Sequence, residues 1–244
     1  DAGAAFVFTR SGTTWSQQQK LTPSDAGDGD HFGQDVAIDG NTVVVGSPGE
    51  DVGYPSYYSV GAIYVYTRSG TTWSQQAKKV PSDPQQYGNF GKKVAIDSGT
   101  IVVGATNYGD NSGQGAVYIF TGSGSSWSQQ QKLVASDASA YDYFGQDVDI
   151  DGDTLVVGAY NEDSEASNAG AAYVYTRSGT TWTLEQKLTA SDGQADDNFG
   201  WSVAIDGDNL IVGAWYEDSE GSNAGAAYVF TRSGTTWTQQ QKLT

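Results

Sequence analysis

One phrase recurs five times along the chain, and this recurrence limits the possible folds more than any other feature. The phrase runs from a Gly-Ala pair through alternating aromatic and β-branched residues to a tryptophan. The closing tryptophans are spaced 58, 54, 55 and 55 residues apart: Trp15, Trp73, Trp127, Trp182 and Trp237. A period of this length is typical of propeller and solenoid repeats rather than of separate domains. We therefore expect one repeat architecture, with the tryptophans packed at equivalent places between neighbouring units.

A second phrase begins with Phe-Gly and interleaves with the first phrase four times, from Phe32, Phe90, Phe144 and Phe199. In the third unit, residues 147–150 and 154–157 flank an Asp-Gly pair, which predicts a β-hairpin with a type I′ turn. Residues 171–176 and 180–188 flank a Ser-Gly pair and predict a second hairpin. The third of these strands is apolar on both faces, whereas the fourth is polar and indicates an outer edge.

These signals predict an all-β fold, namely a β-propeller of four-stranded antiparallel blades. No segment has the 3.6-residue period of an amphipathic helix. The expected blade units span about residues 23–80, 81–134, 135–189 and 190–244 of a single domain, 1–244. Residues 1–22 hold only the last two strands of a unit. The chain thus has four complete blades and an extra N-terminal hairpin, which fits a five-position ring or a section of a larger propeller.

The Phe-Gly elements, each followed some fourteen residues later by Gly-Ala or Gly-Ser-Pro, resemble the FG-GAP repeats of integrin α chains and of many bacterial surface and secreted proteins. The resemblance covers essentially the whole chain. It implies a propeller used for adhesion or ligand binding rather than for catalysis. The integrin-type calcium loop is not matched, because stretches such as Asp151-Gly152-Asp153 are too short to wrap an ion that takes about 6 to 8 oxygen ligands. We interpret them as turns.

Composition narrows the classes of partner. The formal net charge of −17, from 29 acidic and 12 basic residues, disfavours nucleic acids and anionic membranes. No apolar run is long enough to insert in a membrane as a helix. The chain has no cysteine, and it has no methionine even at position 1, which favours a processed or excised product and secretion. We expect a secreted or cell-surface protein.

Signals for catalysis are weak. The single histidine, His31, stands at a variable loop position and has no serine or cysteine motif beside it. We therefore expect no enzymatic activity. A glycoside hydrolase stays open as a minor alternative, because paired carboxylates are plentiful.

Acidic residues recur in the loop before each Phe-Gly element. A Ser-Asp pair is followed five residues later by a second aspartate in three units, and two such carboxylates could share a Ca²⁺ ion with backbone carbonyls. The candidate metal ligands are Asp25, Asp30, Asp137, Asp142, Asp192 and Asp197. The alternative is that they form Asx-turns at the entry to each blade, or are simply solvated.

Aromatic and acidic residues stand together in the loop after each Gly-Ala element, where the aromatic residues do not recur in kind. Rings beside carboxylates suit contacts with sugars or peptides. The candidate ligand-binding residues are Tyr108, Tyr160, Glu162, Asp163, Trp215, Tyr216, Glu217 and Asp218. The alternative is that the rings fill gaps between blades.

Two functions are thus favoured. The first is an extracellular binding or adhesion module that recognises protein or carbohydrate through its blade loops. The second is a structural subunit of an extracellular assembly, completed by strand pairing between copies, because the hairpin of residues 3–22 leaves an open edge.

Overall fold

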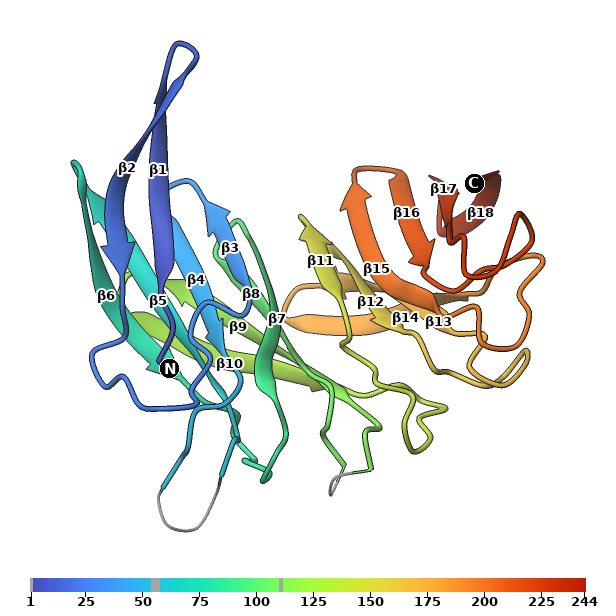
Figure 1. Ribbon diagram of the computed structural model, residues 1–244, viewed down its shortest axis with the longest axis horizontal. Helices are drawn as coiled ribbons and strands as arrows, with labels where there is room; N and C mark the ends of the chain where they lie inside the picture. The colour runs from blue at the N-terminus through green and yellow to red at the C-terminus, as the bar shows by residue number, and fades with distance from the viewer. Residues whose placement is uncertain (1, 54–57, 110–111) are drawn as a thin grey trace.

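The computed structural model describes residues 2–53, 58–109 and 112–244, and these ranges contain β-strands and no helix. Among the described residues there is accordingly no helix that could cross a membrane. The all-β prediction is confirmed. The strands form one two-stranded hairpin and four four-stranded sheets (Figure 1).

The N-terminal hairpin consists of β1 (Ala5–Ser11) and β2 (Thr14–Leu21). Repeat 1 consists of β3 (Val36–Asp39), β4 (Thr42–Ser47), β5 (Ala62–Ser69) and β6 (Thr72–Lys79). Repeat 2 consists of β7 (Phe90–Asp97), β8 (Thr100–Ala105), β9 (Ala116–Ser123) and β10 (Ser126–Leu133). Repeat 3 consists of β11 (Val148–Asp151), β12 (Thr154–Ala159), β13 (Ala171–Ser178) and β14 (Thr181–Leu188). Repeat 4 consists of β15 (Phe199–Asp206), β16 (Asn209–Ala214), β17 (Ala226–Ser233) and β18 (Thr236–Leu243).

Within each repeat the strands pair antiparallel in chain order, so the first strand and the fourth strand are the two edges. The third and fourth strands share an irregularity of register, which in repeat 3 falls between Val174 and Tyr175. A shift of this kind is a β-bulge, which increases local twist. The polar fourth strand lies at an edge of each sheet, as the sequence indicates.

The turn between the first and second strands of repeat 3 differs from the predicted type, whereas in repeat 2 both loop residues, Ser98 (φ 46°) and Gly99 (φ 76°), have the positive φ of a type I′ turn. Asp151 pairs with Thr154, so the two loop residues are Gly152 and Asp153. Only the glycine has a positive φ, 57°. A glycine at the first of two loop positions is the pattern of a type II′ turn, whereas the predicted type I′ turn needs positive φ at both.

The four sheets follow one another in a row that does not close. In Figure 1 the hairpin β1–β2 and the sheet β15–β18 lie at opposite ends of the long axis, with repeats 2 and 3 between them. The structure therefore supports the repeated four-stranded sheets of the prediction and shows no closed ring.

The core is divided among the junctions between neighbouring sheets. At the junction of repeats 2 and 3, Val117 and Ile119 of β9 belong to the same buried cluster as Leu155 and Val157 of β12. The two recurring phrases of each repeat also pack on each other, because the Phe-Gly phenylalanine meets two rings of the third strand edge-on. The ring of Phe144 lies 5.3 Å from that of Tyr173 and 6.2 Å from that of Tyr175.

Four of the five repeated tryptophans lie buried at these junctions. Trp182 is 2% exposed, and the side chain of Gln131 in the preceding repeat holds its backbone at both ends. Gln131 Oε1 accepts from Trp182 N at 2.8 Å, and Gln131 Nε2 donates to Trp182 O at 2.9 Å. The prediction is wrong for Trp15, which is 64% exposed because, among the residues that the structure describes, no sheet lies before the hairpin in the row.

Candidate functional site

The two acidic loops of each repeat meet around one lysine. In repeat 3, Lys187 Nζ lies 2.7 Å from Asp137 Oδ2 and 2.9 Å from Glu162 Oε1. The hydroxyl of Tyr173 donates to Asp137 Oδ1 at 2.9 Å. Glu162 is buried, so a buried carboxylate is paired with an ammonium group, as its desolvation requires.

The same network recurs with one substitution. Lys78 contacts Asp25 and Glu50 in repeat 1, and Lys242 contacts Asp192 and Glu217 in repeat 4. In repeat 2, Tyr108 replaces the glutamate. Its ring centroid lies 3.4 Å from Lys132 Nζ, a cation–π contact, and its hydroxyl donates to Asp83 at 3.2 Å.

These contacts set the charge state of the first aspartate in each loop. Burial alone would raise the pKa of Asp25, Asp137 and Asp192, but hydrogen bonds from the neighbouring lysine and tyrosine outweigh it and hold each pKa below its ordinary value. The carboxylates therefore stay ionised and pair with the ammonium group.

The second predicted metal ligands cap backbone groups. Asp30, Asp142 and Asp197 each accept from an N–H three residues earlier; the distance from Ser139 N to Asp142 Oδ2 is 2.7 Å. Burial and the nearby Glu162 and Asp163 raise the pKa of Asp142 to about 6. Among the residues that the structure describes, no three acidic or histidine side chains are grouped to hold a metal ion. Calcium at these loops stays a prediction, and there it would have to compete with the lysine.

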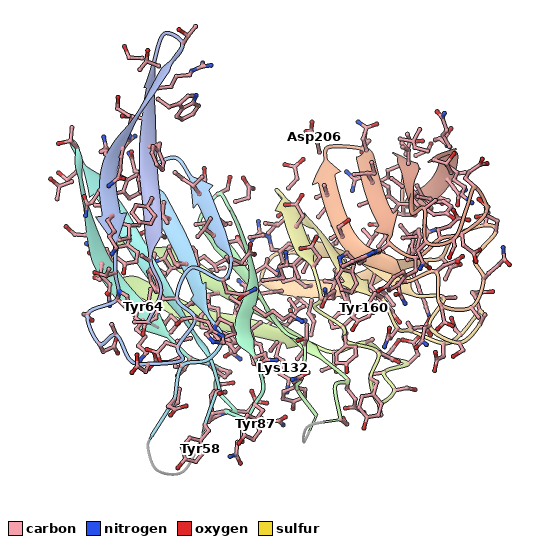
Figure 2. All side chains as sticks on the ribbon, in the orientation of Figure 1. Tyr58, Tyr64, Tyr87, Lys132, Tyr160 and Asp206 are labelled. Carbon is pink, nitrogen blue, oxygen red and sulfur yellow. The ribbon has the colours of Figure 1, made fainter. Side chains whose placement is uncertain are left out.

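A continuous run of aromatic rings crosses from repeat 3 to repeat 4. Tyr160 stacks on Tyr143 with centroids 5.3 Å apart, and it meets Trp201 edge-on at 4.8 Å. Trp201 meets Trp215 edge-on at 4.3 Å, and Trp215 stacks on Tyr216 at 5.4 Å. Tyr160 lies among the loops in Figure 2, at the opposite edge of the sheets from the turn that carries Asp206.

Beside this run lies a groove of about 700 Å³. It is lined by aromatic, amide and carboxylate residues from both repeats: Tyr160, Asn161, Asn168, Ala195, Asp196, Asn198, Trp201, Tyr216, Asp218 and Asn223. Asn168 Nδ2 donates to Asp196 Oδ1 at 2.7 Å across the two repeats. Buried Asn198 donates to Tyr160 O at 3.3 Å and Asn168 O at 3.2 Å, which fixes the loops against each other.

The groove gathers part of the predicted ligand-binding set. Tyr160, Tyr216 and Asp218 line it. Two more residues support its walls: Asp163 accepts from Asn168 N at 2.7 Å, and Trp215 packs on Trp201. Tyr108, Glu162 and Glu217 instead belong to the lysine networks described above.

Sequence reasoning missed Trp201 and the asparagines. Trp201 follows Phe-Gly, where the other repeats have Gln34, Lys92 and Gln146, so a non-recurring aromatic inside a recurring motif was the available signal. Four missed residues adopt left-handed backbone conformations, which Asn and Asp tolerate best: Asn168 (φ 52°), Asp196 (φ 68°), Asn198 (φ 57°) and Asn223 (φ 55°). His31, at φ 57°, occupies the position of Asn198 in repeat 1.

A family model described as FG-GAP repeat matches the chain four times, at residues 15–66, 73–120, 127–175 and 182–230. Each match begins at one of the repeated tryptophans, and together the matches cover well over half of the chain.

Proposed function

The chain belongs to the FG-GAP repeat family, and on that premise we propose that it is a non-enzymatic extracellular module that binds carbohydrate through the groove between repeats 3 and 4. FG-GAP repeats occur in extracellular binding and adhesion modules. In this proposal the four sheets are blades of a propeller, and the loops at one edge of the blades form the binding face.

One observation carries the proposal: aromatic faces and fixed polar groups line the same groove. Tyr160, Trp201 and Tyr216 supply flat apolar area for the C–H face of a sugar ring. Asn161, Asn168 and Asn223 supply amide donors and acceptors for hydroxyl groups, which is the mixture that small-molecule sites use for affinity and orientation.

Charge limits the class of sugar. Asp196 and Asp218 line the groove, and the whole chain carries a formal net charge of −17. Acidic sugars and sulfated glycans would be repelled. The proposed ligands are therefore neutral or amino-sugar oligosaccharides.

Binding without turnover is part of the proposal. The histidine is exposed on a loop of repeat 1, outside the residues that line the groove. The buried carboxylate pairs near the loops are engaged by lysine, which leaves them in a structural role.

The test is isothermal titration of the whole chain with a panel of soluble neutral, amino-sugar and sulfated oligosaccharides. We expect binding by neutral or amino sugars, with quenching of tryptophan fluorescence. Trp201→Phe should weaken binding less than Trp201→Ala, because the phenylalanine ring still offers a flat apolar face for the sugar to stack on. Asp196→Asn should weaken the binding of amino sugars more than that of neutral sugars.

The control is Trp15→Ala, which removes an exposed tryptophan outside the groove and should leave sugar affinity unchanged. Equal loss of binding in the Trp15 and Trp201 variants would place the ligand elsewhere. An absence of binding across the panel would overturn the carbohydrate proposal.

A further inference from the structure

The aromatic run beside the groove continues past the groove towards repeat 2. Tyr160, which lines the groove, stacks on Tyr143 with ring centroids 5.3 Å apart. Tyr143 in turn contacts the ring of Tyr141 at a centroid distance of 6.4 Å. Tyr143 is partly buried, whereas Tyr141 is 59% exposed. An exposed ring is therefore connected to the groove through two successive ring contacts.

Tyr141 is the counterpart of Asp196, which lines the groove. Each stands three residues before the Phe-Gly phenylalanine of its repeat. The backbone N–H of each donates to a loop of the preceding repeat. Tyr141 N donates to Ser112 O at 2.6 Å, and Asp196 N donates to Ser167 O at 2.8 Å. The junction of repeats 2 and 3 therefore presents a ring at the place where the junction of repeats 3 and 4 presents a carboxylate.

The backbone conformation of Tyr141 is unfavourable for a tyrosine. Its φ is 72°, in the left-handed region, which glycine adopts freely and a bulky side chain rarely adopts. In repeat 1 the same position is Gly29, with a φ of 89°. Burial does not offset the strain at Tyr141, since more than half of the side chain is exposed. A strained residue that does not fill the core indicates a role in binding.

The loop that carries Tyr141 is held in place. The next residue, Asp142, is buried, and its Oδ2 accepts from Ser139 N at 2.7 Å. Tyr143 N donates to Gly113 O at 2.8 Å, in the loop of repeat 2. A ring on a fixed loop loses little conformational freedom when a ligand stacks on it, so the loop is already arranged for binding.

We propose that Tyr141 and Tyr143 form a second sugar subsite, and that the protein binds an inner segment of a linear polysaccharide of neutral or amino sugars. The inference rests on the proposed function, because it takes the groove between repeats 3 and 4 as the first subsite. From the groove the sugar chain passes over Tyr160 towards repeat 2, and a further sugar residue stacks on the ring of Tyr141. Affinity therefore depends on chain length.

Tyr87 provides an internal comparison at the junction of repeats 1 and 2. It holds the same position before Phe90 as Tyr141 holds before Phe144. Its φ is 59°, and its side chain is 49% exposed. Tyr87 lies one repeat further from the groove, and Figure 2 shows it apart from Tyr160. A short oligosaccharide that fills the groove and reaches Tyr141 should not reach Tyr87.

The experiment is isothermal titration of the whole chain with oligosaccharides of graded length, from disaccharide to tetrasaccharide. The probes are cello-oligosaccharides and chito-oligosaccharides, the latter in acetylated and deacetylated forms. These oligomers are linear and present flat ring faces. We expect affinity to rise by roughly tenfold from the disaccharide to the tetrasaccharide, as one more sugar residue gains an aromatic contact.

Substitutions of Tyr141 separate a binding role from a structural role. Tyr141→Gly and Tyr141→Asn should abolish the gain with chain length and leave the affinity of the disaccharide unchanged. Tyr141→Phe should keep most of the gain, because it keeps the ring. Tyr141→Gly should leave the melting temperature unchanged or raise it by up to roughly 4 °C, because it relieves the left-handed strain.

The matched control is Tyr87→Gly, which removes the same side chain from the same backbone conformation one repeat away. It should have the same effect on the melting temperature as Tyr141→Gly. It should leave the affinity of every oligomer in the series unchanged.

The outcomes distinguish this inference from the proposed function. A disaccharide that binds and depends on Trp201, with no gain on lengthening, would overturn the second subsite and leave the proposed function standing. Equal losses of tetrasaccharide affinity in the Tyr87 and Tyr141 variants would also overturn it. A lower melting temperature of Tyr141→Gly with unchanged affinity would assign the ring to the fold. An absence of binding by every oligomer would overturn both proposals.

Discussion

Residues 36–40 and residues 203–207 are the same five amino acids, yet they lie in opposite environments. The second segment receives three aspartate side chains from repeat 3 and buries its valine and isoleucine. The first segment faces an open groove with both side chains more than half exposed. The sequence of the segment therefore determines that it forms a β-strand, whereas the neighbouring repeat determines whether the side chains of that strand are buried.

The burial of the repeated tryptophans depends on the neighbouring repeat in the same way. Trp237 is buried and its backbone N–H donates to Gln186 of the preceding repeat at 2.8 Å, whereas Trp15 is exposed and the described residues include no repeat before it. The stabilisation therefore comes from the junction between neighbouring repeats and not from the recurring sequence that ends in each tryptophan.

The largest expected effect is at the tryptophans. Trp182→Ala should lower the free energy of unfolding by about 3 to 5 kcal/mol, because it leaves a cavity in a packed junction. Trp15→Ala should cost less than about 0.5 kcal/mol, as for an ordinary surface change. Urea unfolding of both variants measures the difference. Equal losses would mean that the phrase stabilises its own hairpin regardless of neighbours.

An intermediate effect is expected at the glutamines that hold the next tryptophan. Gln186→Ala should cost about 2 kcal/mol, because it leaves the N–H and C=O of Trp237 without their partner. Repeat 1 has Ala77 at the corresponding position, before Trp127. Ala77→Gln should therefore stabilise the protein by about 1 kcal/mol. A destabilising Ala77→Gln would show that this junction is packed differently from the others.

Thermal or urea unfolding at one pH is sufficient for both glutamine variants, since neither adds a titrating group. The double variant Ala77→Gln with Trp127→Ala is the control. In this double variant the added glutamine should stabilise the protein less than in Ala77→Gln alone. The backbone of residue 127 can still bind the glutamine, but the indole ring that closes the junction is gone.

The smallest expected effect is electrostatic and concerns the loops of repeat 3. Burial raises the pKa of Asp142 to about 6, above its ordinary value of 3.8, so between these values the folded state binds more protons than the unfolded state. The contribution of Asp142 to stability must then rise as pH falls from about 7 towards 4. Asp142→Asn should remove about 1 kcal/mol of this rise, because the amide does not titrate. The amide oxygen can still accept from Ser139 N, so the loop contact is kept.

Asp137 has the opposite sign. Its pKa is lowered by Lys187 and Tyr173 in spite of burial, so its stabilising contribution is present above about pH 4 and is lost as pH falls further. Unfolding free energies measured at pH 7, 5 and 3 separate the two residues. A pH profile that is identical in wild type and Asp142→Asn would contradict the assigned environment of Asp142.

Most of the fold was readable because its signals are local. Strand β14 was expected over residues 180–188 and runs over Thr181–Leu188, since alternation and the preceding Ser-Gly turn mark it. The type of the turn between the first two strands was harder to predict. It depends on which residues form the last pair before the turn, and the sequence alone does not fix that register. Whether the row of sheets closes is not encoded in any single repeat.

The candidate site was only partly readable because it is built from loops that are distant in sequence. Tyr160 and Tyr216 were found as aromatics beside acids, but Trp201 enters the groove from a strand. Glu162 and Glu217 were predicted to bind a ligand, whereas in the structure each pairs with a lysine 25 residues further along the chain. Recurrence of the lysine in each repeat was the one sequence signal for that structural role.

The most direct test of the central claim is native-state hydrogen exchange at the identical segments. The amides of Val203, Ile205 and Gly207 donate to aspartates of repeat 3. Their counterparts Val36 and Ile38 line the open groove, and Gly40 follows them in the turn after β3. We expect protection of the first three amides to exceed that of the second three by more than about tenfold. Equal exchange rates in the two segments would contradict the claim that neighbouring repeats, and not the repeated sequence itself, determine burial.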